Sequence, residues 1–90
     1  ILTVVVTLST ENKAIIAGPD VISRGFVYVR ESEKLMDEAR DIVRDVFTKC
    51  EERKITDWST LKSTVRDELK SFLYEKTKRK PMILPIIMEI

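Results

Sequence analysis

Residues 18–32, GPDVISRGFVYVRES, separate a β-rich part of the chain from a helical part. They hold both glycines of the sequence and one of its three prolines. Because proline lacks an amide donor and glycine accepts unusual backbone angles, Gly18 and Pro19 predict a bend or bulge in a sheet. Aromatic and β-branched residues at 26–29 resume a strand pattern, and Ser32 is a favourable helix N-cap. The stretch is therefore predicted to lead from a sheet into the first helix.

The residues before this stretch predict a β-hairpin. Aliphatic side chains occupy every second position of residues 2–8, which places them on one face of a strand. A short polar turn at residues 10–12 then returns residues 13–17 as an antiparallel partner. Gly25 permits a second local twist, so that residues 13–29 are compatible with one long bent strand or two short ones.

The residues after this stretch predict two helices and a closing strand. Apolar residues recur at helical spacing from Leu35 to Cys50 and again from Trp58 to Leu73, and Thr56 and Asp57 are suited to cap the second helix. Residues 82–90 alternate with apolar side chains on both faces. We therefore expect an α+β fold of one domain, residues 1–90: a two-layer sandwich in which a three- to four-stranded, mainly antiparallel sheet packs against an αα-hairpin.

Composition excludes several classes of protein. With 43% hydrophobic and 34% charged residues, the 90-residue chain is neither a disordered tail nor a fibrous protein. The longest apolar run, residues 81–88, is shorter than the roughly 20 residues of a membrane span, so we expect a cytoplasmic protein without a membrane partner. The sequence begins at Ile1 inside a β-pattern without an initiator methionine or leader, which predicts a piece of a longer chain.

Charge is unevenly divided along the chain. Residues 31–53 hold five Lys/Arg against eight Asp/Glu, whereas residues 54–81 hold eight against four. Four cations gather near the end of the second helix: Lys76, Lys78, Arg79 and Lys80. They are candidates for contact with RNA phosphates, although cations at this position also complement the helix dipole and keep the helix end soluble. Trp58 is interpreted as a core residue, with base stacking as the alternative.

The chain offers little for catalysis or metal binding. It contains no histidine and a single cysteine, Cys50, so that a zinc site of the usual kind and an internal disulfide are excluded. Cys50 has no base to activate it and is interpreted as a buried structural thiol. Asp37, Asp41 and Asp45 form an i, i+4, i+8 row, which we interpret as a solvated face with Arg40 and Arg44 offsetting the repulsion. No catalytic, cofactor or metal residue is assigned.

The closing strand predicts an interface. Ile83, Pro85 and Ile87 form its second apolar face, which a small sandwich does not obviously cover. Burial under the helical hairpin is the alternative. Pro85 also removes one hydrogen-bond donor from the strand, as is typical of an edge strand.

Two long strings in the right order, GPDVISRGFVYVRES and FLYEKTKRKPMILPIIMEI, identify a family resemblance that covers essentially the whole chain. The sequence resembles the C-terminal domain of bacterial ribonuclease J, a metallo-β-lactamase and β-CASP ribonuclease. The resemblance implies a longer parent enzyme that degrades and matures RNA as a 5′-to-3′ exonuclease and endonuclease. It also implies that the parent's zinc ions are held by histidines and aspartates of its β-lactamase domain. None of those motifs occurs in this chain.

Two functions follow as expectations. The first, implied by the resemblance, is a non-catalytic domain that supports oligomerisation and full activity, whose partners are the remaining domains of its own chain and a second copy or a ribonuclease J paralogue. The second is an independent RNA-binding module that uses the basic run at residues 76–80. Salt-dependent RNA binding separates them, because phosphate contacts weaken steeply with salt and apolar contacts do not.

Overall fold

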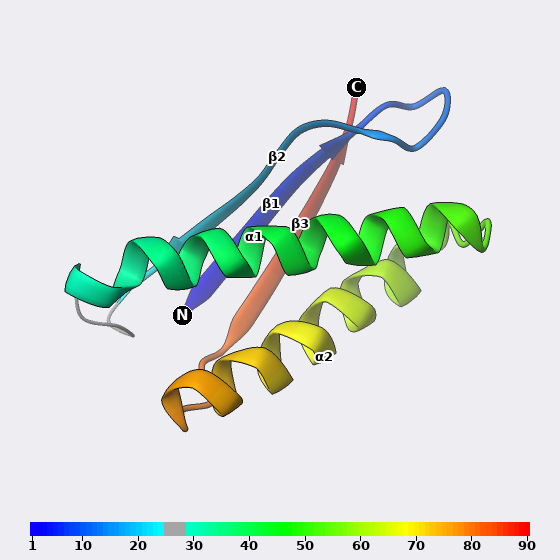
Figure 1. Cartoon of the computed structure of the whole chain (residues 1–90). Coiled ribbons are helices and arrows are strands. Elements are labelled where there is room, and N and C mark those ends of the chain that lie inside the picture. Colours follow the sequence, from blue (N-terminus) through cyan, green and yellow to red (C-terminus); the bar gives the residue numbers. More distant parts are fainter. Residues whose placement is uncertain (25–28) are drawn as a thin grey trace.

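The fold is a sheet of three strands covered on one side by two helices (Figure 1). The computed structural model describes residues 1–24 and 29–90. In chain order the elements are β1 (Leu2–Leu8), β2 (Ile15–Ser23), α1 (Val29–Glu52), α2 (Trp58–Thr77) and β3 (Ile83–Glu89). The predicted α+β class is confirmed.

The sheet has the order β2-β1-β3, with β1 in the centre. β1 pairs antiparallel with β2 and parallel with β3, so the sheet is mixed and not mainly antiparallel as predicted. The chain reverses direction between β1 and β2, again between β2 and α1, a third time between α1 and α2, and finally between α2 and β3 (Figure 1). It therefore returns along β3 in the direction of β1, and the two helices together form the crossover that a parallel pair needs. Backbone hydrogen bonds of 2.8 Å from Leu2 to Met82 and 3.1 Å from Ile90 to Leu8 close both ends of this pair.

The predicted irregularity at Gly18 and Pro19 is present, and β2 runs through it as one bent strand. The register of β2 against β1 shifts twice, between Val5 and Thr7 and between Thr7 and Leu8. Each shift adds one residue to β2 and exchanges the faces of the sheet to which its side chains point. Gly18 has φ +85°, and a β-carbon there would lie 2.7 Å from the carbonyl oxygen of Val5. Only glycine fits this approach without strain.

Helix α1 begins earlier than the sequence predicts. Its first residue is Val29, three residues before Ser32, so that Ser32 lies within the helix and is not its N-cap. Val29 is likewise helical and not part of a strand. Residues 26–28 of the predicted strand, and the predicted special conformation of Gly25, lie outside the described residues.

Helix α2 is capped at both ends. The Asp57 carboxylate accepts hydrogen bonds from the Thr60 hydroxyl (2.8 Å) and the Thr60 amide (2.9 Å), as predicted for an N-cap. These two hydrogen bonds, the side-chain one first, lower the pKa of Asp57 from its ordinary value. At the other end Lys78 adopts a left-handed conformation and its amide donates to the Tyr74 carbonyl. The helix therefore ends just as the basic run begins.

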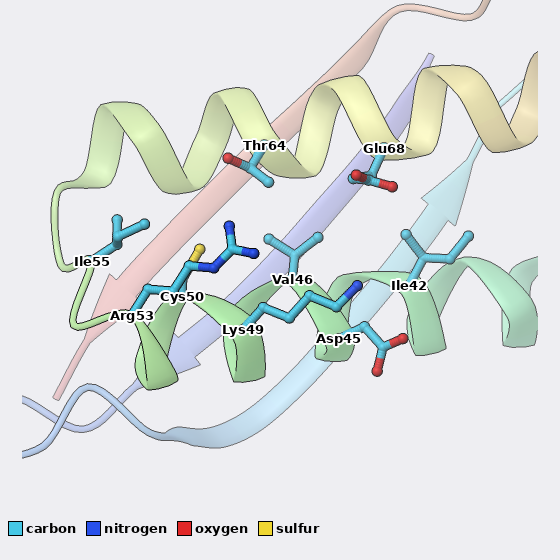
Figure 2. Close-up of a pocket in the computed structure, with 9 residues that line it drawn as sticks. All are labelled: Ile42, Asp45, Val46, Lys49, Cys50, Arg53, Ile55, Thr64 and Glu68. Carbon is cyan, nitrogen blue, oxygen red and sulfur yellow. The ribbon is translucent and has the colours of Figure 1, made fainter.

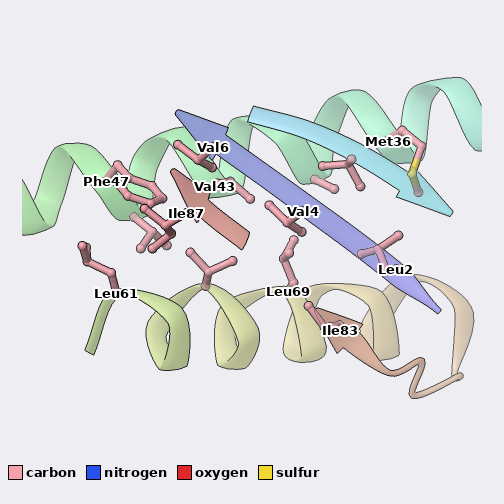
Figure 3. Packing of buried hydrophobic residues seen from close by; sticks show 14 of the residues in the cluster. Leu2, Val4, Val6, Met36, Val43, Phe47, Leu61, Leu69, Ile83 and Ile87 are labelled. Atoms are coloured by element: carbon pink, nitrogen blue, oxygen red, sulfur yellow. The ribbon is translucent and has the colours of Figure 1, made fainter. Parts of the chain in front are cut away.

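The core lies between the helices and one face of the sheet (Figure 3). Leu2, Val4, Val6 and Leu8 of β1 are almost fully buried, as their alternation predicts. The helices contribute apolar ridges to this layer: Leu35, Met36, Ala39, Val43, Val46, Phe47 and Cys50 from α1, and Leu61, Val65, Leu69 and Leu73 from α2. Among the described residues no helix has the length and hydrophobicity needed to cross a membrane.

Candidate functional site

The two faces of β3 are both apolar, and the structure covers the one that was predicted to be bare. Ile83 and Ile87 are 4% and 7% exposed and belong to the core beneath α2, and Pro85 is half-buried (Figure 3). The prediction that Ile83, Pro85 and Ile87 form an uncovered interface is therefore wrong for this face. The physical reason is that α2 packs directly on β3 and needs an apolar surface beneath it.

The uncovered apolar surface is the opposite side of the sheet. In β3 it presents Leu84, Ile86 and Met88, each between 44% and 46% exposed. The register places these side chains beside Thr3, Val5 and Thr7 of β1, and β2 adds Ile22, Asp20 and Ala17 opposite these three residues. We call this surface the open sheet face; its members are Thr3, Val5, Thr7, Ala17, Asp20, Ile22, Leu84, Ile86 and Met88. No signal in the sequence distinguishes this face of β3 from the other, because both are continuously apolar.

The outer edge of β3 is blocked against pairing with another strand. The amide of Leu2 donates to the carbonyl of Met82, and the amide of Ile90 donates to the carbonyl of Leu8. The even-numbered residues from 82 to 90 therefore direct their backbone groups toward β1. By alternation the odd-numbered residues direct theirs to the free edge. Pro85 is one of these, and it has no N–H to offer there. Contact between two copies is thus favoured through the open sheet face and disfavoured along this edge.

The basic run lies where α2 ends and the chain turns toward β3. The Nζ atoms of Lys78 and Lys80 lie 5.2 Å and 5.1 Å from the centroid of the Tyr74 ring, within the range of cation–π contact. Lys76 instead faces α1, where its Nζ is 4.0 Å from a carboxylate oxygen of Glu38. The amide of Arg79 donates to the Thr77 hydroxyl. The four predicted residues are therefore close in space but divided between two sides of the helix end.

Trp58 does not have the predicted position in the core. It is the first residue of α2 and 40% exposed, and the Nζ of Lys62 lies 5.8 Å from its ring centroid. Leu61, three residues after Trp58, occupies the buried position that was expected of Trp58. The indole is consequently available to a ligand.

A pocket of about 260 Å³ lies between the C-terminal half of α1 and the middle of α2 (Figure 2). Its charged lining is balanced, with Asp45 and Glu68 against Lys49 and Arg53. The pocket is smaller than ordinary ligand sites of roughly 300–1,000 Å³. Cys50 lies in its wall and is 5% exposed, which confirms the interpretation as a buried thiol. With no histidine in the sequence, Cys50 lacks the usual base that would activate it as a nucleophile.

The acidic row of α1 is a solvated face, as interpreted from the sequence. Asp37 pairs with Arg40, and Asp41 pairs with Arg44 at 3.0 Å. Within residues 1–24 and 29–90 no group of three His, Cys, Asp or Glu side chains is arranged to hold a metal ion. The donor set present here does not fit zinc.

Comparison with known proteins assigns the chain to one family. A family model described as the ribonuclease J C-terminal domain matches residues 1–90. The chain is 57% identical to ribonuclease J2 of Bacillus subtilis (strain 168) over 90 residues, all of this chain and 16% of that protein. It is 50% identical to ribonuclease J 2 of Staphylococcus saprophyticus over 86 residues, 96% of this chain and 15% of that protein. The chain thus spans about one sixth of the length of these curated relatives.

Proposed function

Because the chain belongs to the ribonuclease J C-terminal domain family, we propose that it is a non-catalytic assembly domain of a longer ribonuclease J chain. The parent enzyme degrades and processes RNA as a 5′-to-3′ exonuclease and endonuclease in the cytoplasm. Zinc and the catalytic residues belong to the remaining domains of the parent. The observation that carries the proposal is the open sheet face, an apolar surface on an otherwise highly charged domain.

The proposed occupant of the open sheet face is the same face of a second copy. The face is uncharged along β1 and β3, and its one carboxylate, Asp20, lies on the edge strand β2. Two such faces can pack as a sandwich about 10 Å apart. An interface that is the same patch on both subunits is the common arrangement in homodimers. The blocked outer edge of β3 favours this face-to-face contact over strand pairing between the copies.

The size of the face sets the expected strength of association. β1 and β3 have seven residues each and β2 has nine, so the three strands cover roughly 14 Å by 23 Å, or about 300 Å², where all three are paired. A stable interface buries about 800 Å² on each partner. We therefore expect weak association of the 90-residue chain alone and stronger association in the parent enzyme, where the other domains enlarge the contact.

Sedimentation equilibrium tests the proposal with a matched pair of variants. Ile86→Lys places a charge in the middle of the open sheet face, and Thr48→Lys adds the same charge at an exposed position of α1. The unmodified chain and Thr48→Lys are expected to show a concentration-dependent rise in mass, whereas Ile86→Lys remains monomeric. In the parent enzyme, Ile86→Lys is expected to reduce both assembly and RNA cleavage. A parent Ile86→Lys that assembles and cleaves like the unmodified enzyme overturns the proposal.

A second candidate function is direct RNA binding by the basic run. The observation that favours it is the half-exposed Tyr74 ring, which is 44% exposed and carries Lys78 and Lys80 over its surface. An aromatic ring with adjacent cations matches the stacking and phosphate contacts of proteins that bind single strands. The triple variant Lys76→Gln/Lys78→Gln/Lys80→Gln is expected to bind RNA more weakly and with a shallower salt dependence. Unchanged affinity and unchanged salt dependence in this variant contradict a role of the run.

A further inference from the structure

One ridge of helix α2 carries only aromatic and basic side chains. Residues four apart are neighbours on a helix surface, and this spacing connects a single row from the first residue of α2 to its C-cap. The row, which we call the aromatic–basic ridge, consists of Trp58, Lys62, Arg66, Lys70, Tyr74 and Lys78. The three carboxylates of the helix, Asp67, Glu68 and Glu75, lie on other rows. The ridge is therefore a continuous positive strip with an aromatic ring near each end.

The aromatic–basic ridge faces away from α1. On one side of the buried ridge of α2, Thr64 and Glu68 line the pocket shared with α1, and Lys76 pairs with Glu38. The aromatic–basic ridge follows the opposite flank of the buried ridge, and both rows wind around the helix axis by about 40° at each step of four residues. Because α1 packs over β2 and α2 over β3, this side is at the outer edge of the sheet (Figure 1).

The charges of the ridge are not neutralised by neighbours. Of the carboxylates in the described part of the chain, none forms an ion pair with Lys62, Arg66 or Lys70. β3 contributes one carboxylate at this side of the molecule, Glu89, and it pairs with Lys13. All six members of the ridge are exposed or half-exposed. The strip is thus accessible to an anionic ligand.

The rings at the two ends are flanked by cations. Lys62 lies over Trp58, and Lys78 lies over Tyr74. The rings are 16 positions apart, which corresponds to about 24 Å along the helix, and successive members of the row are about 6 Å apart. A ligand that alternates flat rings with closely spaced negative charges is complementary to this pattern.

We propose that the aromatic–basic ridge binds single-stranded RNA along its length. Lys62, Arg66 and Lys70 contact successive phosphates, and Trp58 and Tyr74 stack on bases. A single strand fits better than a duplex, because its bases are free to stack on protein rings. The inference deepens the second candidate function: it extends the contact from the basic run to the whole outer side of α2. It is independent of the open sheet face.

Fluorescence anisotropy with a short, unpaired, labelled RNA tests the phosphate contacts. The variant Lys62→Gln/Arg66→Gln/Lys70→Gln removes three cations from the ridge, and Lys34→Gln/Arg44→Gln/Lys49→Gln removes three exposed cations from α1. Each phosphate contact of a single strand contributes about 0.7 to the slope of log affinity against log salt. The ridge variant is therefore expected to lose about 2 from this slope and at least tenfold in affinity. The α1 variant is expected to keep the slope, and circular dichroism verifies that both remain helical.

Substitution of the rings tests the stacking contacts. Trp58→Leu and Tyr74→Leu are each expected to weaken RNA binding by about 5- to 150-fold, the range of measured base–aromatic stacking. Trp58→Phe and Tyr74→Phe are expected to restore most of the affinity. Equal weakening by the leucine and phenylalanine variants contradicts stacking and overturns the proposed role of the rings.

The remaining outcomes separate this inference from its alternatives. Equal losses in the ridge and α1 variants would indicate general charge attraction and overturn the ridge as a site. If only the Lys76→Gln/Lys78→Gln/Lys80→Gln variant loses RNA affinity, the second candidate function is supported, but the proposed RNA contact along the rest of α2 is overturned. Binding to phosphatidylserine vesicles but not to RNA would assign the strip to a lipid surface and overturn the inference. Sedimentation of the ridge variant is expected to match the unmodified chain, because assembly depends on the other surface.

Discussion

The two faces of the sheet differ in what covers them, although the same three strands form both. On the covered face Leu2, Val4, Val6 and Leu8 lie beneath the helices with almost no exposed surface. On the open face the intervening residues of β1 are half-buried and those of β3 are more than 40% exposed. The difference shows that hydrophobicity alone does not identify the core side of a strand. Contact with the helical hairpin decides it.

The comparison is sharpest at two adjacent isoleucines of β3. Ile87 is 7% exposed and Ile86 is 44% exposed, yet they have the same side chain and are neighbours in one strand. Identical substitutions at the two positions therefore compare the two faces directly.

The largest effect is expected for Ile87→Lys. The variant places an unpaired charge beneath α2, and burial of such a charge costs several kcal/mol. A domain of this size is stable by only about 4–13 kcal/mol, so that the variant is expected to be largely unfolded or strongly destabilised. Urea unfolding followed by circular dichroism measures the loss. A variant as stable as the unmodified 90-residue chain would show that water reaches the covered face of the sheet.

A smaller effect is expected for Gly18→Ala. The added β-carbon meets the Val5 carbonyl oxygen, and φ +85° is unfavourable for alanine. We expect a loss of about 1–3 kcal/mol, the usual cost of strain at special backbone positions. Asp20→Ala, at an exposed position of the same strand, is the control and should change stability little. Equal urea midpoints for the two variants would mean that the approach of β2 to β1 tolerates a side chain.

A modest effect is expected for Asp57→Ala, which removes the cap of the helix that covers β3. The folded-state pKa of Asp57 is lowered by its hydrogen bonds to Thr60. The ionised cap therefore stabilises the folded chain above the unfolded-state pKa of about 3.9, and this contribution is lost as pH falls through the lower folded-state pKa.

Urea midpoints at neutral and acidic pH measure this contribution. Asp57→Ala is expected to be less stable than the unmodified chain at neutral pH, with a difference that shrinks in acid. Asp57→Asn, which retains a capping side chain without a charge, serves as the control for the pH dependence. A difference that is constant with pH would exclude the carboxylate charge as its source.

The smallest effect on stability is expected for Ile86→Lys. A charge on the open face remains in water, so that the urea midpoint should correspond to a change within about 0.5 kcal/mol. The same variant is expected to lose association, as described above. Strong destabilisation of the dilute, monomeric chain would instead place Ile86 in the core and remove the distinction between the faces.

The sequence by itself predicted the elements that rest on local chemistry. The alternation of β1 and the periodicity of α1 are repeated patterns with one solution each, and both are confirmed. Asp57 as a cap and the irregularity at Gly18 also depend on the chemistry of single residues, and the structure contains both. The family resemblance rests on two long strings and is confirmed by the match over residues 1–90.

The tertiary structure alone decided what depends on how these elements meet. The sequence does not determine whether β3 pairs with β1 or with β2, because both edges of the hairpin accept a strand. In the structure β3 pairs with β1, and the pair is parallel. The side of β3 that became core was equally open, because both of its faces are apolar and only the position of α2 distinguishes them. Trp58 likewise fits the helical period of α2, but it is the first residue of this helix and is 40% exposed. It therefore lies outside the core that the sheet and the helices enclose. Local patterns specify which side chains prefer to be buried, and the packing of distant segments determines which of them are.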